Sequence, residues 1–210
     1  MELTEFVRLQ LPGPPGRVLE VGCGEGKLAL ALADGGWDVL AIDPAAPEGA
    51  IFRRLKLEDL EDAGAFDAVV AARSLHHVTN LEAGIDRIRE LLRPEGVLVL
   101  DEFAWDRLDE VTAEWFHGQQ RALVAAGRLP HAPETLDDCR REWEEEHVGL
   151  HGYETMRAAL DERFTERSFE WLPYLYRLLD GVAGEGLERT LIDAGAIQAT
   201  GFRYVGVKAA

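Results

Sequence analysis

Apolar runs alternate with helix-like segments over the first half of the chain. Continuous runs lie at Val18–Val21, Val39–Ile42, Phe66–Ala72 and Val97–Leu100, with a weaker one at Ile51–Leu57. Runs that lack polar alternation are typical of strands buried on both faces of a parallel sheet. The pattern therefore predicts five strands in an α/β protein.

Helical signals separate these strands. Lys27–Ala33 has helical spacing and ends before Gly35–Gly36. A second helix is predicted to begin at Thr79-Asn80-Leu81-Glu82, which matches a Ser/Thr-x-x-Glu capping box. Its apolar positions recur on one face, and Pro94–Gly96 is predicted to break the chain before the fifth strand. The alternation of strand and helix favours a parallel sheet with helices on both faces.

The periodicity changes after Phe103. About sixty residues follow with helical spacing, many charges and scattered aromatic side chains, and they predict two to four helices. A sixth strand is expected at Arg167–Leu172, a helix at Leu187–Ala194 and a last strand at Phe202–Val207. We interpret residues 1–210 as a single domain that carries a helical insertion at 103–165.

The acidic composition limits the partners. The 210 residues include 39 acidic and 22 basic side chains, with a net charge of −17. Nucleic acids and anionic membranes are bound through Lys and Arg, so neither is expected as a partner. The N-terminus has no basic leader and no apolar stretch of signal-peptide length, so a cytoplasmic location is expected. Two cysteines are too few for a disulfide framework, and reduced thiols are expected at Cys23 and Cys139. No pattern indicates an oligomeric state.

Three glycines stand between the first strand and the first helix. Gly22, Gly24 and Gly26 would let a ligand lie against the backbone at a helix N-terminus, where N–H groups are unpaired. The dinucleotide pattern G-x-G-x-x-G fails, because its third glycine would fall at Lys27. An acid, Glu20, precedes the loop and would repel a pyrophosphate but attract an ammonium group. The loop therefore predicts a ligand with an amino-acid end.

Four motifs in order along the chain resemble those of class I S-adenosylmethionine-dependent methyltransferases. They are LEVGCGEG, AIDP, FDAVVAARSLHHV and RIRELLRPEGVLVLDEF, and the likeness covers roughly residues 17–103. One departure is Pro94-Glu95-Gly96, where the family often has Pro-Gly-Gly. The resemblance implies a Rossmann-like three-layer sandwich with strand order 3-2-1-4-5-7-6, in which only the last strand is antiparallel. It also implies S-adenosylmethionine as the cofactor.

The resemblance assigns cofactor contacts position by position. It implies that Glu20 and the glycine backbone face the methionine portion and that Asp43 binds the ribose hydroxyls. Relatives often have an Asp followed by a small residue in the segment that is Lys56-Leu57-Glu58-Asp59 here. If Lys56 fills the Asp position, it cannot accept from the adenine amino group; the backbone N–H of Leu57 would then reach the ring and Glu58 would supply the acceptor. The cofactor-binding positions are Glu20, Gly22, Cys23, Gly24, Gly26, Asp43, Pro44, Leu57, Glu58, Arg73 and Ser74.

Histidines offer candidate proton acceptors, because imidazole titrates near neutrality. His76 follows the fourth strand and is the first candidate, although it could instead simply pack in that loop; His117 of the insertion is the second. His147 and His151 have the i, i+4 spacing of zinc ligands, but Val148 replaces the glutamate of H-E-x-x-H, so no metal is expected. Residues of the insertion are expected to cover the reacting methyl group and bind the substrate: Trp105, Trp115, His147, His151 and Tyr153.

Two functions of different classes remain open. The first is a methyltransferase that transfers a methyl group from S-adenosylmethionine to an unidentified small molecule. The second is a non-catalytic S-adenosylmethionine-binding sensor or partner subunit. A nicotinamide-dependent oxidoreductase is a distant third, because the glycine spacing does not fit a dinucleotide.

Overall fold

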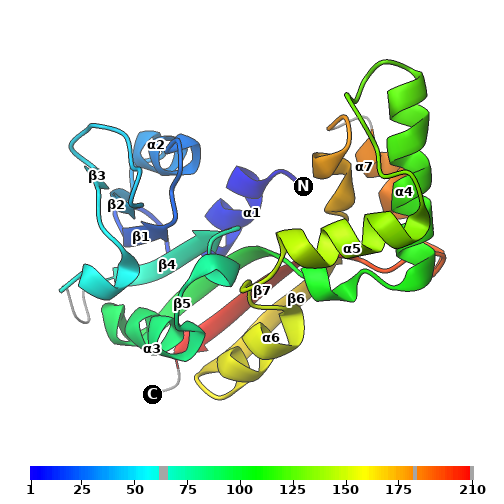
Figure 1. Cartoon of the computed structure of the whole chain (residues 1–210). Helices are drawn as coiled ribbons and strands as arrows, with labels where there is room; N and C mark the ends of the chain where they lie inside the picture. The colour runs from blue at the N-terminus through cyan, green and yellow to red at the C-terminus, as the bar shows by residue number, and fades with distance from the viewer. Residues whose placement is uncertain (62–65, 182–183, 209–210) are drawn as a thin grey trace. The chain divides into compact units, whose positions relative to one another are not determined.

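Among the residues that the structure describes, seven strands form one sheet in the order β3-β2-β1-β4-β5-β7-β6, as predicted (Figure 1). The computed structural model describes residues 1–61, 66–181 and 184–208. The strands are β1 Arg17–Val21, β2 Asp38–Ile42, β3 Phe52–Arg53, β4 Phe66–Ala72, β5 Leu92–Phe103, β6 Phe164–Leu172 and β7 Gly201–Lys208. The helices are α1 Leu3–Gln10, α2 Lys27–Asp34, α3 Leu81–Leu91, α4 Glu110–Ala125, α5 Leu136–Glu146, α6 Tyr153–Asp161 and α7 Glu185–Asp193.

The apolar runs of the sequence become the parallel centre of the sheet. β1 pairs in parallel with both β2 and β4, and β4 pairs in parallel with β5. The arrow of β7 runs against that of β4 (Figure 1). The strand order changes direction between β1 and β4, and in open α/β sheets ligands bind beyond the carboxyl ends of strands at such a switch point.

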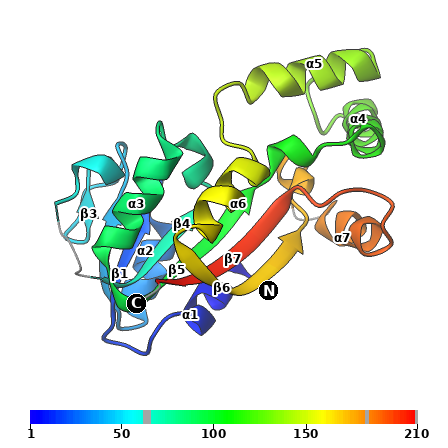
Figure 2. The same cartoon turned by 90° about the horizontal axis from the view of Figure 1, so that it is seen from below.

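Helices cover both faces of this part of the sheet. α1 and α2 lie on one face, where Phe6 and Leu32 pack in one apolar cluster with Val18, Val70 and Val99 of the strands. α3 and α6 lie on the opposite face (Figure 2). Alternate residues of each strand point to opposite faces, so continuous apolar strands are needed to serve both layers.

Three local expectations need correction. The N-cap of α3 is Asn80 rather than Thr79, and its side-chain oxygen accepts a hydrogen bond from Ala83 N–H at 3.1 Å. Pro94–Gly96 does not break the chain, because β5 runs through it with a shift in register against β4. Glu95 takes a left-handed φ of 62° there. The third strand is reduced to two residues of the range Ile51–Leu57.

The chain divides into two compact units. The first contains Met1–Glu102, Glu154–Glu170 and the segment from Arg203; the second contains Phe103–Tyr153 and Trp171–Phe202. The second unit holds α4, α5 and α7, and Phe116 of α4 and Trp143 of α5 are buried in one apolar cluster. Three α-helices between Phe103 and β6 agree with the predicted two to four. No helix among the described residues is long and apolar enough to span a bilayer.

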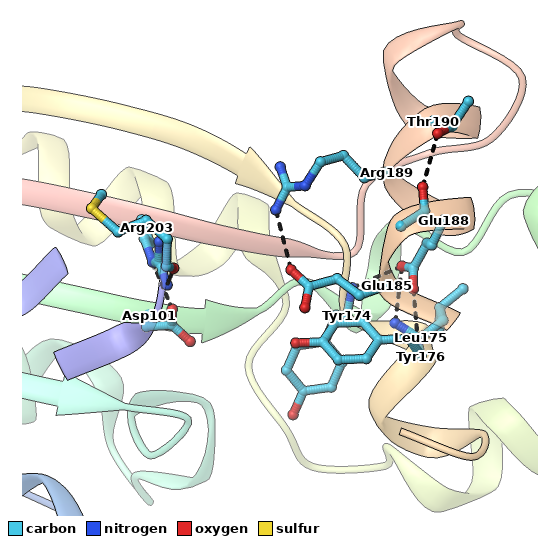
Figure 3. A network of polar contacts seen from close by, with 11 residues as sticks. Asp101, Tyr174, Leu175, Tyr176, Glu185, Glu188, Arg189, Thr190 and Arg203 are labelled. Carbon is cyan, nitrogen blue, oxygen red and sulfur yellow. Dashed lines mark hydrogen bonds and ion pairs between the residues drawn. The ribbon is translucent and has the colours of Figure 1, made fainter. Parts of the chain in front are cut away.

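A buried ion pair joins two strands of the first unit. Arg203 Nε donates to Asp101 Oδ2 at 2.8 Å, with both side chains less than one-tenth exposed (Figure 3). The guanidinium also lies 4.4 Å from the centre of the Phe6 ring and donates to the carbonyl of Met1 at 3.2 Å. The pair therefore connects β5 and β7 to the N-terminal helix α1.

Removing one partner of this ion pair should destabilise the fold more than replacing both partners. Arg203→Met leaves a buried Asp101 carboxylate without its partner and should lower the free energy of unfolding by about 3–5 kcal/mol. The double variant with Asp101→Asn should recover a large part of that loss. Urea denaturation measures both. Arg93→Met is the control: its pair with Asp67 is half-exposed, so the change should stay within about 1 kcal/mol. Equal losses in the single and double Asp101–Arg203 variants would contradict the expectation.

Candidate functional site

Glycine is required for different structural reasons at the three positions of the loop after β1. All three have positive φ: 73° at Gly22, 50° at Gly24 and 77° at Gly26. A Cβ at Gly22 would lie 2.3 Å from the Cβ of Ser74, and a Cβ at Gly26 would lie 2.5 Å from the Phe52 ring. A Cβ at Gly24 would meet nothing within 4 Å. Two glycines therefore permit packing inside the protein, and only Gly24 leaves an open cradle against the backbone.

Asp43 links the end of β2 to this loop. Its Oδ2 accepts a hydrogen bond from Gly24 N–H at 3.1 Å, and its Oδ1 accepts one from Ala45 N–H at 2.7 Å. The N–H groups of Gly22 and Cys23 donate to the carbonyl of Ile42, the residue before Asp43. The carboxylate thus shapes the loop, and each oxygen keeps a lone pair for a second donor.

Glu20 is a buried acid with an unsatisfied oxygen. Its side chain lies in β1, and Oε2 has no hydrogen-bond partner among the residues that the structure describes. The pKa of Glu20 is raised to about 7, mainly by burial and to a smaller degree by the charge of Asp43, while the backbone N–H of Ala29 opposes the shift. An unpaired buried carboxylate oxygen is costly, so a cationic group at this position would compensate it.

Cys23 is not a reactive thiol. Burial, with the negative charges of Glu20 and Asp43, raises its pKa to about 12, so the thiolate is absent near neutral pH. Cys23 and Cys139 are both free, as predicted, and both are buried.

The loop after β4 closes against the glycine loop. Arg73 adopts a left-handed φ of 55°, and the hydroxyl of Ser74 donates to the carbonyl of Val21 at 2.8 Å. The N–H groups of Ser74 and Leu75 both donate to Glu102 Oε1, at 2.8 and 2.6 Å. The ends of β1, β4 and β5 are therefore held together by one serine and one glutamate.

His76 contacts the same glutamate. Its Nδ1 lies 2.6 Å from Glu102 Oε2, and both side chains are almost fully buried. The His76 ring also lies 4.2 Å from that of His77, centre to centre. Sequence analysis missed Glu102, although it follows the apolar run of the fifth strand in LDEF, where an acid ends a buried strand.

The predicted adenine-side residues are spread between buried and exposed positions. Leu57 is buried at the start of a short 3₁₀ turn, Leu57–Asp59. Pro44, Lys56 and Glu58 are exposed. Nothing within the described residues fixes Glu58, so its assignment to the adenine stays a prediction.

The predicted substrate residues fall into two aromatic groups in the second unit. Trp105 stacks on His147 with ring centres 5.6 Å apart, and Trp115 packs against the same buried cluster. Tyr153 instead packs on Trp171 at 4.6 Å. The first group brings Trp105 and His147 into contact with one another. His151 is half-buried and has contacts of its own.

Backbone carbonyls decide which nitrogen of two histidines carries a proton. His117 Nε2 lies 2.8 Å from the carbonyl of Pro133, and His147 Nδ1 lies 2.6 Å from that of Trp143. A carbonyl only accepts, so the facing nitrogen must donate. The second nitrogen of each ring, Nδ1 of His117 and Nε2 of His147, is therefore the proton-accepting one. Among the described residues, no three His, Cys, Asp or Glu side chains are grouped to hold a metal.

Glu188 holds the segment that follows β6. Its buried carboxylate accepts hydrogen bonds from the N–H groups of Tyr174, Leu175 and Tyr176 at 2.7, 3.0 and 2.7 Å (Figure 3). Burial raises the pKa of Glu188, and the three N–H groups oppose the shift. Tyr174 is fixed further by stacking on Phe103 at 4.1 Å.

Comparison with known proteins shows to which family the chain is similar. A family profile described as a methyltransferase domain matches residues 2–172. The ubiquinone biosynthesis O-methyltransferase of Xanthomonas axonopodis pv. citri is 39% identical over 112 residues, which cover 46% of this chain and 46% of that protein. The mitochondrial protein of the same name from Rattus norvegicus is 33% identical over 137 residues, covering 55% and 40%. The chain thus matches about half or less of the length of these relatives.

Solved structures share the fold over the whole chain. An S-adenosylmethionine-dependent methyltransferase from Methanosarcina mazei is 19% identical, covers 100% of this chain and 99% of that chain, and has a TM-score of 0.64. The sheet order and the loop at the β1–β4 switch point define a Rossmann-like domain. With the profile match over most of its length, the chain belongs to the class I, S-adenosylmethionine-dependent methyltransferase family.

The pKa of Glu20 predicts a pH-dependent stability. The folded-state pKa of about 7 exceeds the ordinary 4.5. The contribution of Glu20 to the free energy of unfolding is therefore fully present below pH 4.5 and is lost as the pH rises through 7. As the pH rises from 4.5 to 8, the free energy of unfolding of Glu20→Gln, minus that of the wild type, should increase by about 3 kcal/mol.

Denaturant unfolding at several pH values measures this difference, because titrations common to both proteins cancel. The control is Glu25→Gln, in the same loop but fully exposed, which should give a nearly flat difference. A difference between Glu20→Gln and wild type that does not vary with pH would contradict the expectation.

Proposed function

We propose that this chain transfers the methyl group of S-adenosylmethionine to a hydroxyl group of a small molecule. The observation that carries the proposal is the cradle at Gly24. It is open where a Cβ would stand, and its N–H donates to the Asp43 carboxylate; Glu20, which has an unsatisfied buried oxygen, precedes the same loop in β1. The Glu20 oxygen thus suits an ammonium group, and the Asp43 carboxylate suits hydroxyl donors.

The residues present fit the cofactor. Glu20 would hold its amino-acid end, and Asp43 would accept from the ribose hydroxyls with the lone pairs that Gly24 and Ala45 leave unused. The cofactor, when bound, supplies a methyl group on a good leaving group, and the protein orients donor and acceptor. Gly22 and Gly26 contribute by allowing the loop to pack, and Arg73 and Ser74 are proposed to border the sulfonium end.

The acceptor is proposed to be bound by residues of the insertion, 103–165. The buried indole N–H of Trp105 has no partner among the described residues, and the Nε2 of His147 is a proton acceptor beside it. Such groups within an aromatic cluster suit a mostly apolar molecule with a few polar atoms. The names of the relatives, which are O-methyltransferases, favour oxygen as the acceptor atom.

His76 is proposed as the proton acceptor for that hydroxyl, with His117 as the alternative. His76 has a carboxylate partner that orients its ring, whereas His117 is held by a backbone carbonyl. A non-catalytic S-adenosylmethionine-binding subunit is the competing function. It would need the same cradle but no proton acceptor.

Turnover separates the two functions. Purified protein with S-adenosylmethionine and a panel of small hydroxyl and amine acceptors should form S-adenosylhomocysteine with hydroxyl acceptors, as measured by mass spectrometry. Binding of the cofactor without turnover on any acceptor would favour the non-catalytic subunit. Methylation confined to amines would overturn the assignment of oxygen.

The open cradle can be tested by filling it. Gly24→Ala places a methyl group in the space that the proposal assigns to the cofactor, and the affinity for S-adenosylmethionine should fall at least about tenfold by calorimetry. Gly127→Ala is the matched control, because Gly127 also has positive φ, 69°, and nothing within 4 Å of a Cβ. Both variants carry similar backbone strain. Unchanged affinity in Gly24→Ala would show that the cofactor does not lie against the loop.

A further inference from the structure

Glu102 serves two neighbours at once. Its Oε1 accepts hydrogen bonds from the N–H groups of Ser74 and Leu75, and its Oε2 faces His76 Nδ1 at 2.6 Å. The carboxylate is fully buried at the end of β5, and the imidazole is 95% buried in the 3₁₀ turn Leu75–His77 that follows β4. Twenty-six residues of sequence separate the two side chains.

This arrangement selects one tautomer of His76. A carboxylate that already accepts two backbone N–H groups acts as an acceptor toward the third neighbour as well. The hydrogen bond at 2.6 Å therefore places the proton of His76 on Nδ1. Nε2 is then the nitrogen with the lone pair, which is the form needed to take a proton.

We propose that Glu102 is a positioning residue for methyl transfer: it holds His76 with the proton on Nδ1, so that Nε2 receives the proton of the acceptor hydroxyl. The O–H bond breaks, its electron pair stays on the oxygen, and an N–H bond forms at Nε2. The resulting imidazolium has Nδ1–H against the Glu102 carboxylate, which stabilises the new charge. The inference rests on the proposed function, because it names the partner of its proton acceptor.

A purely structural role for Glu102 makes a different prediction. If the carboxylate only held the loop after β4, any side chain that accepts from Ser74 and Leu75 would replace it. Glu102→Gln is such a side chain, because its amide oxygen can accept from both N–H groups. Its NH₂ group must then face His76, donate to Nδ1 and move the histidine proton to Nε2.

The tautomer can be read without any cofactor. In protein labelled with ¹⁵N-histidine, NMR should show His76 protonated at Nδ1 in the wild type and at Nε2 in Glu102→Gln. His76→Gln identifies the signals by their loss. Glu188→Gln is the matched control, since Glu188 is also buried and accepts three backbone N–H groups but faces no imidazole. It should leave the tautomer of His76 unchanged.

Turnover completes the test. Glu102→Gln should lower kcat about 10–100-fold with a hydroxyl acceptor and leave the KM for S-adenosylmethionine within about twofold, as loss of a proton acceptor implies. An unchanged tautomer in Glu102→Gln, or a reversed tautomer with unchanged kcat, would overturn this inference and leave the proposed methyl transfer standing. A wild-type protein that methylates no hydroxyl would overturn the proposed function itself, a result visible before any variant is made.

Discussion

The carboxyl ends of β1 and β4 meet so closely that no side chain fits between them. A Cβ at Gly22 would lie 2.3 Å from the Cβ of Ser74, and the hydroxyl of that serine donates to Val21. The N–H of Ser74 in turn donates to Glu102, so the end of β5 joins the same contact. The open cradle, the turn that carries His76 and the end of β5 all depend on this approach. A larger residue at Gly22 would therefore disturb all of these features together.

Three buried glutamates, Glu20, Glu102 and Glu188, differ in whether the protein itself supplies their hydrogen-bond partners. Glu102 and Glu188 each have their oxygens occupied by neighbouring N–H groups, and Glu102 has an imidazole as well. Glu20 alone of these three keeps an oxygen with no partner in the part of the chain that the structure describes. Since leaving a buried carboxylate unsatisfied is costly, the chain tolerates it where a ligand would supply the missing partner. This unsatisfied oxygen is the reason why Glu20 is proposed to hold a cationic group of the ligand.

The family and the fold constrain the donor side of the reaction more than the acceptor side. A structure of 19% identity shares the fold over the full length, whereas the two curated O-methyltransferases match only 46% and 55% of this chain. The second unit has its own aromatic cluster, in which a buried indole N–H and an oriented imidazole lie together. These polar groups in an apolar setting are the ones proposed to bind the acceptor.

Local pattern in the sequence determined the strands, their order through the family resemblance, and the glycine loop with its acids, because periodicity and backbone freedom act over a few residues. It misplaced the N-cap of α3 at Thr79, since the cap depends on which residue leaves the helical conformation. It also predicted a break at Pro94–Gly96, whereas β5 continues through these residues and pairs with β4. Only the tertiary structure decided that Gly22 and Gly26 serve packing while Gly24 stays open, and that Glu102 meets His76. Both facts concern atoms brought together from different strands, and no short-range pattern records such an approach.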